Sequence, residues 1–114
     1  MSGISTHVLN LVTGLPARGV AVTLEGQTAL RMWRHIGEGR TDQDGRLDQF
    51  LPAGTRLQAG TYRLTFDVEA YFRSQQTAGF HPEIAITFTV RDPTQHHHIP
   101  LLLGPFGYTT YRGS

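Results

Sequence analysis

The fold class is indicated most directly by the stretch Ile84-Ala85-Ile86-Thr87-Phe88-Thr89-Val90. Its large apolar residues occupy every second position, and the residues between them are small or polar. Because successive side chains of a β-strand point to opposite faces, this alternation predicts a strand with one buried face. The same pattern recurs around residues 20–24 and 62–66. The chain is therefore predicted to consist mainly of half-buried strands.

Further strands are expected at about 6–12, 32–41, 46–49, 95–103 and 107–111, which makes roughly eight in all. Residues with turn chemistry separate them, namely Thr13-Gly14-Leu15-Pro16, Asp42-Gln43-Asp44-Gly45, Pro52-Ala53-Gly54 and Arg91-Asp92-Pro93. An open sheet of such strands would leave its apolar face in water. We therefore expect an all-β fold, a two-sheet β-sandwich, formed as a single domain by residues 1–114.

One segment departs from the strand pattern. Asp67 can cap a helix there, and Gly79 and Pro82 are available to end it. Apolar residues follow the cap at helical spacing, and they are Val68, Tyr71 and Phe72. The sequence predicts one short α-helix in this segment.

Composition excludes several classes of function. The net charge is +1 and the ten cationic side chains are scattered, so no basic patch indicates a nucleic acid or an anionic membrane as partner. Cysteine is absent, which excludes disulfides and thiolate chemistry. No apolar run approaches the roughly 20 residues that span a bilayer. The first ten residues also lack the features of a signal peptide, so a cytoplasmic protein is expected.

The predicted strand at 107–111 contains neither a charge nor a proline that would deter pairing at a sheet edge. An uncovered edge favours pairing with a second copy across a two-fold axis. We therefore expect dimers formed through edge strands, and two such dimers packed into a homotetramer.

Histidines occupy two of the predicted strands. His7 shares a strand face with Leu9, and His98 shares one with His96. Each histidine can be a hydrogen-bonded structural residue or part of a functional site. Arg46 follows the turn at 42–45, and it can be a surface residue or a third member of that site. Alternation sends the side chain of His97 away from its neighbours and no further ligand lies nearby, so no metal is expected.

The chain also resembles a known family along nearly its whole length. Its ending Tyr111-Arg112-Gly113-Ser114 is similar to the C-terminal signature of the 5-hydroxyisourate hydrolases, the transthyretin-related enzymes of urate breakdown. Four more segments resemble motifs of that family in order and spacing, and they are Thr6-His7-Val8-Leu9-Asn10, Thr41-Asp42-Gln43-Asp44-Gly45-Arg46, Phe80-His81-Pro82 and His98-Ile99-Pro100-Leu101-Leu102-Leu103.

This resemblance implies a transthyretin-like fold, a tetramer with a central channel, and hydrolysis of 5-hydroxyisourate without a cofactor. It assigns His7, Arg46, His98 and Ser114 to catalysis. It also implies that the ending closes the pocket around the substrate, with binding residues Tyr111, Arg112, Gly113 and Ser114. The repeated His96 and His97 have no role in the family pattern, and we expect them to face solvent or to pack.

Two other functions fit the same fold. A carrier would bind a small hydrophobic ligand in the central channel, but polar histidine and arginine side chains are unlike the apolar lining of such sites. A structural module that only mediates assembly would explain the edge strand but not the family ending.

Overall fold

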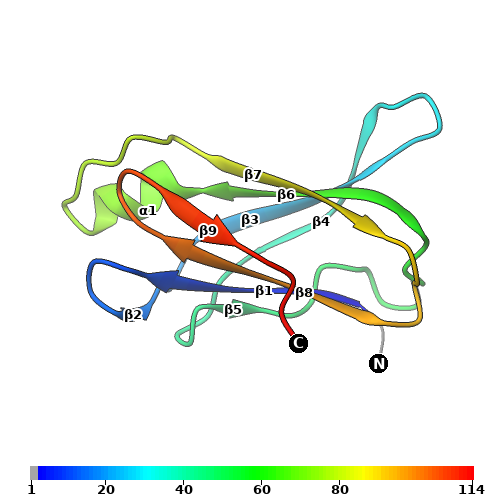
Figure 1. Ribbon diagram of the computed structural model, residues 1–114, viewed down its shortest axis with the longest axis horizontal. Helices are drawn as coiled ribbons and strands as arrows, with labels where there is room; N and C mark the ends of the chain where they lie inside the picture. The colour runs from blue at the N-terminus through cyan, green and yellow to red at the C-terminus, as the bar shows by residue number, and fades with distance from the viewer. Residues whose placement is uncertain (1–2) are drawn as a thin grey trace.

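The computed structural model describes residues 3–114 as two β-sheets packed face to face, with one short helix at an end of the sandwich (Figure 1). Over these residues there are nine strands and one helix, with the bounds β1 Gly3–Asn10, β2 Leu15–Pro16, β3 Ala21–Gln27, β4 Trp33–Arg40, β5 Arg46–Leu47, β6 Gly60–Asp67, α1 Val68–Ser74, β7 Ile84–Val90, β8 His96–Leu103 and β9 Tyr108–Thr110. The predicted all-β, two-sheet architecture with one helix is confirmed.

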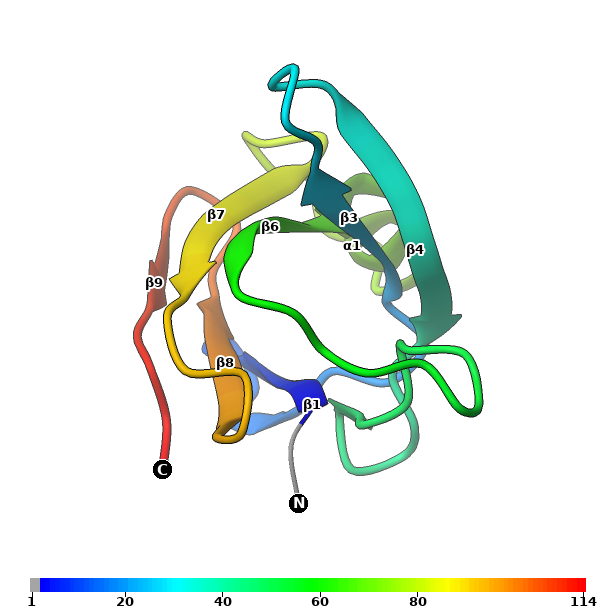
Figure 2. The ribbon, with the colours of Figure 1, turned by 90° about the vertical axis from the view of Figure 1, so that its right-hand side faces the viewer.

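The first sheet has the strand order β2-β1-β8-β9, and β5 also pairs with β1. The second sheet has the order β4-β3-β6-β7. All neighbours are antiparallel except β1 and β8, which run parallel. Figure 2 shows the two sheets around the interior, with the edge strands β7 and β9 on the same side. The predicted edge position of the last strand is confirmed.

The core lies between the sheets and is formed by the inward residues of the alternating strands. Ile84 and Val90 of β7 are buried, whereas Ala85, Thr87 and Thr89 between them are exposed. Each fully buried valine, leucine or phenylalanine side chain contributes about 1.5 to 3 kcal/mol relative to an exposed one. Other fully buried members of the core are Val8, Val22, Leu24, Leu64, Phe66, Leu101 and Leu103.

The helix begins where predicted and ends earlier. The Asp67 carboxylate accepts a hydrogen bond from the Ala70 amide at 3.3 Å and so caps the first turn. The helix ends at Ser74, because Gln76 adopts a left-handed conformation with φ 55° and the Thr77 amide then donates to the Phe72 carbonyl oxygen at 2.9 Å. The expected stop at residues 79–82 was therefore wrong.

Two strand predictions also need correction. The roughly eight predicted strands do not include β2, because its two residues lie within the predicted turn at 13–16. The first strand spans Gly3–Asn10 and not 6–12. It stops at Asn10 because the side-chain oxygen of that residue accepts a hydrogen bond from the Val12 amide at 2.9 Å, which bends the chain.

Candidate active site

The parallel pairing of β1 and β8 brings the two predicted site histidines onto one face. In this register Ser5 lies opposite His98, and His7 lies opposite Pro100. The even-numbered residues of β1 face the core, so Ser5 and His7 face outward. His98 follows the same alternation on β8, since His97 and Ile99 are buried on either side of it. Both histidines therefore lie on the outer face of the first sheet.

Arg46 reaches the same place through β5, in which it is paired directly with His7. A tight turn sets this position, because the Asp42 carboxylate accepts hydrogen bonds from the Asp44 and Arg46 amides at 2.8 and 2.9 Å. The bond from the Arg46 amide is the largest of the effects that lower the pKa of Asp42. Gly45 has φ 74° and no room for a side chain, as an added Cβ would lie 2.4 Å from the Val8 carbonyl oxygen.

The structure thus brings together His7, Arg46 and His98 from three separate strands. His98 is half-buried, and burial is the largest effect that lowers its pKa. The positive charge of Arg46, and that of His7 when its ring is protonated, lower the pKa of His98 further, because each opposes a charged imidazolium. An imidazole held in its neutral form in this way can accept a proton near neutral pH.

The C-terminal residues run alongside β8 and contact His98. The Gly113 amide donates to the His98 carbonyl oxygen at 2.8 Å, and the two residues form an isolated bridge. Gly113 also lies against the imidazole ring, since a Cβ added to it would be 2.6 Å from His98 Cδ2. The Arg112 guanidinium donates to the Gln95 side-chain oxygen at 3.0 Å. Tyr111 and Ser114 are exposed.

Ser5 is a member of the site that the sequence prediction missed. It is 4% exposed, and its hydroxyl lies 2.7 Å from His96 Nε2 and 2.8 Å from His98 Nδ1. The available signal was strand periodicity, because Ser5 stands two residues before His7 and so shares its face. His96 is exposed on that face, whereas His97 is buried on the core side and lies hydrogen-bonded to the Gln95 carbonyl oxygen at 3.0 Å. His96 therefore faces solvent and His97 packs in the interior, and these are the two environments that we expected for the pair.

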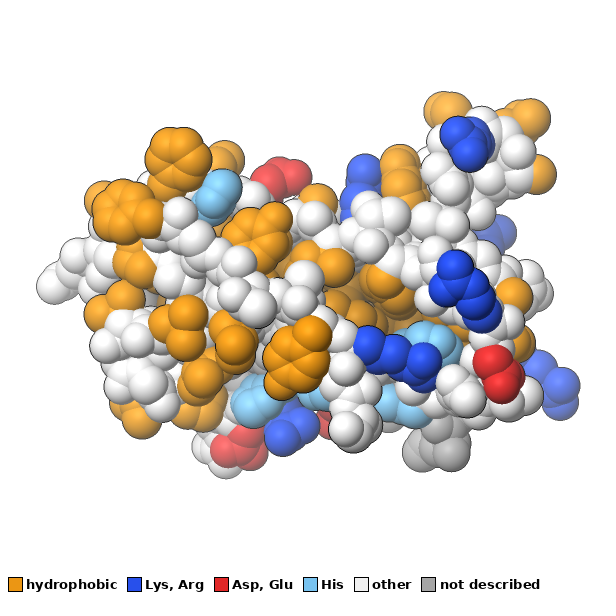
Figure 3. Space-filling view, viewed as in Figure 1, with side chains coloured by type: hydrophobic (Ala, Val, Ile, Leu, Met, Phe, Trp, Pro, Cys, Tyr) orange, Lys and Arg blue, Asp and Glu red, His pale blue; other side chains and the backbone are white. Residues whose placement is uncertain are grey.

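Figure 3 shows histidine side chains in a row along the lower rim of the molecule, with arginine side chains beside them. Within residues 3–114 no three or more histidine, aspartate or glutamate side chains are grouped as metal ligands. In the same residues no helix is long and apolar enough to cross a membrane.

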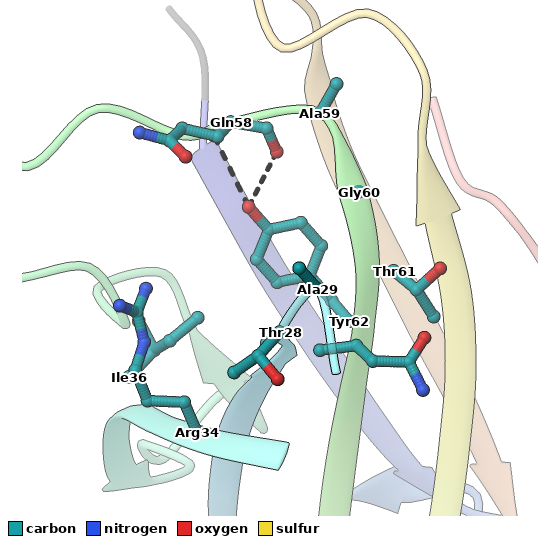
Figure 4. A pocket seen from close by; sticks show the side chains of 11 residues that line it. Thr28, Ala29, Arg34, Ile36, Gln58, Ala59, Gly60, Thr61 and Tyr62 are labelled. Carbon is teal, nitrogen blue, oxygen red and sulfur yellow. Dashed lines mark hydrogen bonds between the residues drawn. The ribbon is translucent and has the colours of Figure 1, made fainter. Parts of the chain in front are cut away.

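Two hollows lie at the end of the sandwich where β1, β6 and β8 begin. One of about 340 Å³ lies between the β3–β4 hairpin and the start of β6, where the Tyr62 hydroxyl donates to the Gln58 carbonyl oxygen at 2.6 Å (Figure 4). It belongs to the second sheet and contains none of the predicted site residues. The other, about 620 Å³, is lined by residues 48–55 together with Gly3, Ile4 and His96. It therefore lies next to His96, whose ring is within hydrogen-bond distance of Ser5.

Fold and site together define a class, that of two-sheet β-sandwich proteins with imidazole and guanidinium groups gathered on the outer face of one sheet. A model of the HIUase/Transthyretin family matches residues 4–113, and the chain belongs to this family. The family resemblance expected from the sequence is confirmed.

Individual relatives agree with this assignment. The 5-hydroxyisourate hydrolase of Mus musculus is 40% identical, and the match covers 99% of this chain and 96% of the relative. The structure of the Klebsiella pneumoniae 5-hydroxyisourate hydrolase is similar with a TM-score of 0.85, 34% identity and coverage of 99% of this chain and 100% of the other. Sea bream transthyretin in complex with thyroxine has a TM-score of 0.88, 32% identity and coverage of 96% and 93%.

Proposed function

We propose that this chain hydrolyses 5-hydroxyisourate, the product of urate oxidation, at a cyclic amide C–N bond. The six-membered ring opens and yields 2-oxo-4-hydroxy-4-carboxy-5-ureidoimidazoline. The observation that carries the proposal is the convergence of His7, Arg46 and His98 on one outer face, in a chain whose relatives are named for this reaction.

Hydrolysis of an amide bond requires an activated water molecule, stabilisation of the oxyanion that forms, and a proton for the leaving nitrogen. In the proposed mechanism the neutral His98 imidazole removes a proton from water, and His7 orients the water or substrate and helps to return the proton. Arg46 carries a permanent positive charge, so its guanidinium holds the planar substrate and stabilises the oxyanion. No step in this scheme calls for a cofactor.

The C-terminal residues form a wall of the pocket in this proposal. Gly113 already lies against the His98 ring, so the residues next to it are within the same region of the outer face. Ser114 then binds substrate or water, with Tyr111 and Arg112 beside it. Because this face is open in a single chain, a neighbouring subunit supplies the remaining walls.

The proposed assembly is a homotetramer, a dimer of dimers. Its support is the pair of uncovered strands at one side of the sandwich, β7 and β9, which lie at the edges of their sheets. The exposed residues of β7 are Ala85, Thr87 and Thr89, and Tyr108 on β9 is 42% exposed. None of these residues carries a charge that would oppose pairing with a second copy.

A spectrophotometric assay tests the reaction. 5-Hydroxyisourate is generated from urate in the cuvette, and the purified protein should hasten its decay. His98→Ala should lower turnover about a hundredfold, as the loss of a general base does, while the oligomer stays intact. The matched control is His35→Ala, an exposed histidine on β4 in the other sheet. If the unaltered protein does not change the decay, the proposed reaction is wrong, and normal turnover in His98→Ala would remove that residue from the mechanism.

A further inference from the structure

A serine hydroxyl lies behind the proposed base and joins it to a second histidine. We infer that Ser5 and His96 form a positioning chain that fixes the tautomer and orientation of His98. In this chain His98 carries its proton on Nδ1 and donates it to Ser5 Oγ, and Ser5 donates its own proton to His96 Nε2. The inference rests on the proposed function and deepens it, because it leaves Nε2 of His98 as the bare nitrogen that accepts the proton from water.

Strand register produces this arrangement. Ser5 pairs with His98 across the parallel strands, and Gly3 pairs with His96. The side chains of Ser5, His96 and His98 lie on the same outer face, so the Ser5 hydroxyl lies between two imidazoles that are two residues apart on β8. Its oxygen is 2.7 Å from one ring nitrogen and 2.8 Å from the other, and both distances are those of hydrogen bonds.

Proton counting selects the direction of the chain. A hydroxyl has one proton to donate and can accept hydrogen bonds at the same oxygen, so with two neutral imidazoles Ser5 donates to one and accepts from the other. If Ser5 donated to His98, the proton of that ring would lie on Nε2 and the ring could not accept a proton there. In the inferred direction His98 gains a proton at Nε2 and keeps the same bond to Ser5. Only in this direction does His98 keep its hydrogen bond to Ser5 both as the neutral imidazole and as the imidazolium.

The ring is held on two sides. Ser5 binds Nδ1, and Gly113 lies against Cδ2 and Cγ, so the edge formed by Cε1 and Nε2 is left for the substrate. The titratable and charged groups that act on the ring are His7 from β1, Arg46 from β5, Asp48 just after β5, and His96 from β8. The charge of Arg46 favours the neutral ring, as do His7 and His96 when they are protonated, whereas Asp48 favours the charged ring. A neutral ring needs a partner such as Ser5 to fix one of its two tautomers.

Substitutions of Ser5 and His96 show whether the two residues position His98 or only pack beside it. Ser5→Ala should lower kcat by roughly tenfold to hundredfold, the range seen when partners that orient metal-bound histidines are removed. KM should change by less than about twofold, because substrate binding is retained. Ser5→Thr keeps the hydroxyl and adds a methyl group at a buried position. Its turnover should be closer to that of the unaltered protein than the turnover of Ser5→Ala. His96→Ala combined with Ser5→Ala should be no worse than Ser5→Ala alone, because both act through one chain.

The pH profile supplies a readout that a structural role would not move. Ser5 accepts a charge-assisted bond from the His98 imidazolium, so Ser5→Ala should lower the pKa of His98 and shift the acidic limb of kcat to lower pH. The matched control is Thr6→Val, which removes the 2.6 Å bond from Thr6 Oγ1 to the Ile99 carbonyl oxygen on the core side of the same strand pair. It should lower the melting temperature and leave the acidic limb where it is.

NMR of the resting protein tests the chain without any turnover. In protein with ¹⁵N-labelled histidine, the His98 signal, assigned by its loss in His98→Gln, should show a protonated Nδ1 and a bare Nε2. A proton on Nε2 would overturn the inference, as would unchanged kcat and pH profile in Ser5→Ala. Absence of hydrolysis in the unaltered protein would contradict the proposed reaction, and the NMR result would still decide whether the chain exists.

Discussion

Gly113→Ala tests whether the chain end packs on the proposed base in the working protein. The added Cβ would lie 2.6 Å from His98 Cδ2 and 3.2 Å from Pro100 Cγ. Carbon atoms in ordinary contact are about 3.5 to 4.0 Å apart, so either the ring or the chain end must move by about 1 Å. Misplacement of a catalytic group by about 1 Å can lower turnover about a hundredfold. We therefore expect kcat to fall by about that factor in the 5-hydroxyisourate assay.

The same substitution should cost little stability. If the chain end lifts, the bond from the Gly113 amide to the His98 carbonyl oxygen is lost, and one such bond contributes about 0.5 to 1.5 kcal/mol. Urea titration should therefore show a small change in the free energy of unfolding beside a large change in turnover. Removal of residues 113–114 should reproduce the loss if the chain end moves rather than the ring.

Gly107→Ala is the matched control, because no heavy atom lies within 4 Å of the Cβ it would add. It should leave kcat unchanged. Turnover of Gly113→Ala within about twofold of the unaltered protein would refute the reasoning, because a contact at this distance cannot be relieved without displacement of the ring or the chain end.

Three further predictions concern the chain end and the two histidines with lowered pKa. A peptide tag fused after Ser114 should reduce turnover far more than the same tag at the N-terminus, as measured in the same assay. Arg46→Met should raise the pKa of His98, because a charge that opposes the imidazolium is lost, and the acidic limb of kcat/KM should move to higher pH. The free energy of unfolding, measured by urea titration, should fall as pH drops through about 6.5. The reason is that burial lowers the pKa of His97, so that this histidine takes up a proton in the unfolded chain before it does so in the folded one. The variant His97→Phe should show a smaller fall.

Strand periodicity predicted the buried side of the strands near residues 20–24, 62–66 and 84–90. On β7 it placed Ile84 and Val90 in the core, and on β1 it placed His7 on the face of Leu9, as the structure has them. These predictions succeed because the period of two is a local property of the backbone. The two-residue β2 was missed for the same reason, since two residues are too few to show a period.

Periodicity does not reveal which strands are neighbours. His7 and His98 are 91 residues apart, and the parallel pairing that brings their strands together leaves no local signal. Family resemblance supplied the grouping with Arg46, and the register then explains it physically. Periodicity places Ser5 on the face of His7, but it does not reveal what Ser5 does, because that depends on a contact with an imidazole from a distant strand.

The residues of the site also distinguish between two functions that fit this fold, transport of a small ligand and hydrolysis. The sea bream transthyretin of similar fold was crystallised with thyroxine, and pockets for such ligands are lined mainly by apolar and aromatic groups. Here the Arg46 guanidinium opposes protonation of the half-buried His98 imidazole, and Ser5 lies within hydrogen-bond distance of Nδ1 of that ring. An apolar ligand would gain nothing from a neutral, oriented base, and it would leave the Arg46 guanidinium and His98 Nε2 facing an apolar surface in place of water. A reaction that consumes water at this face uses every one of them, and for this reason we favour hydrolysis over ligand transport.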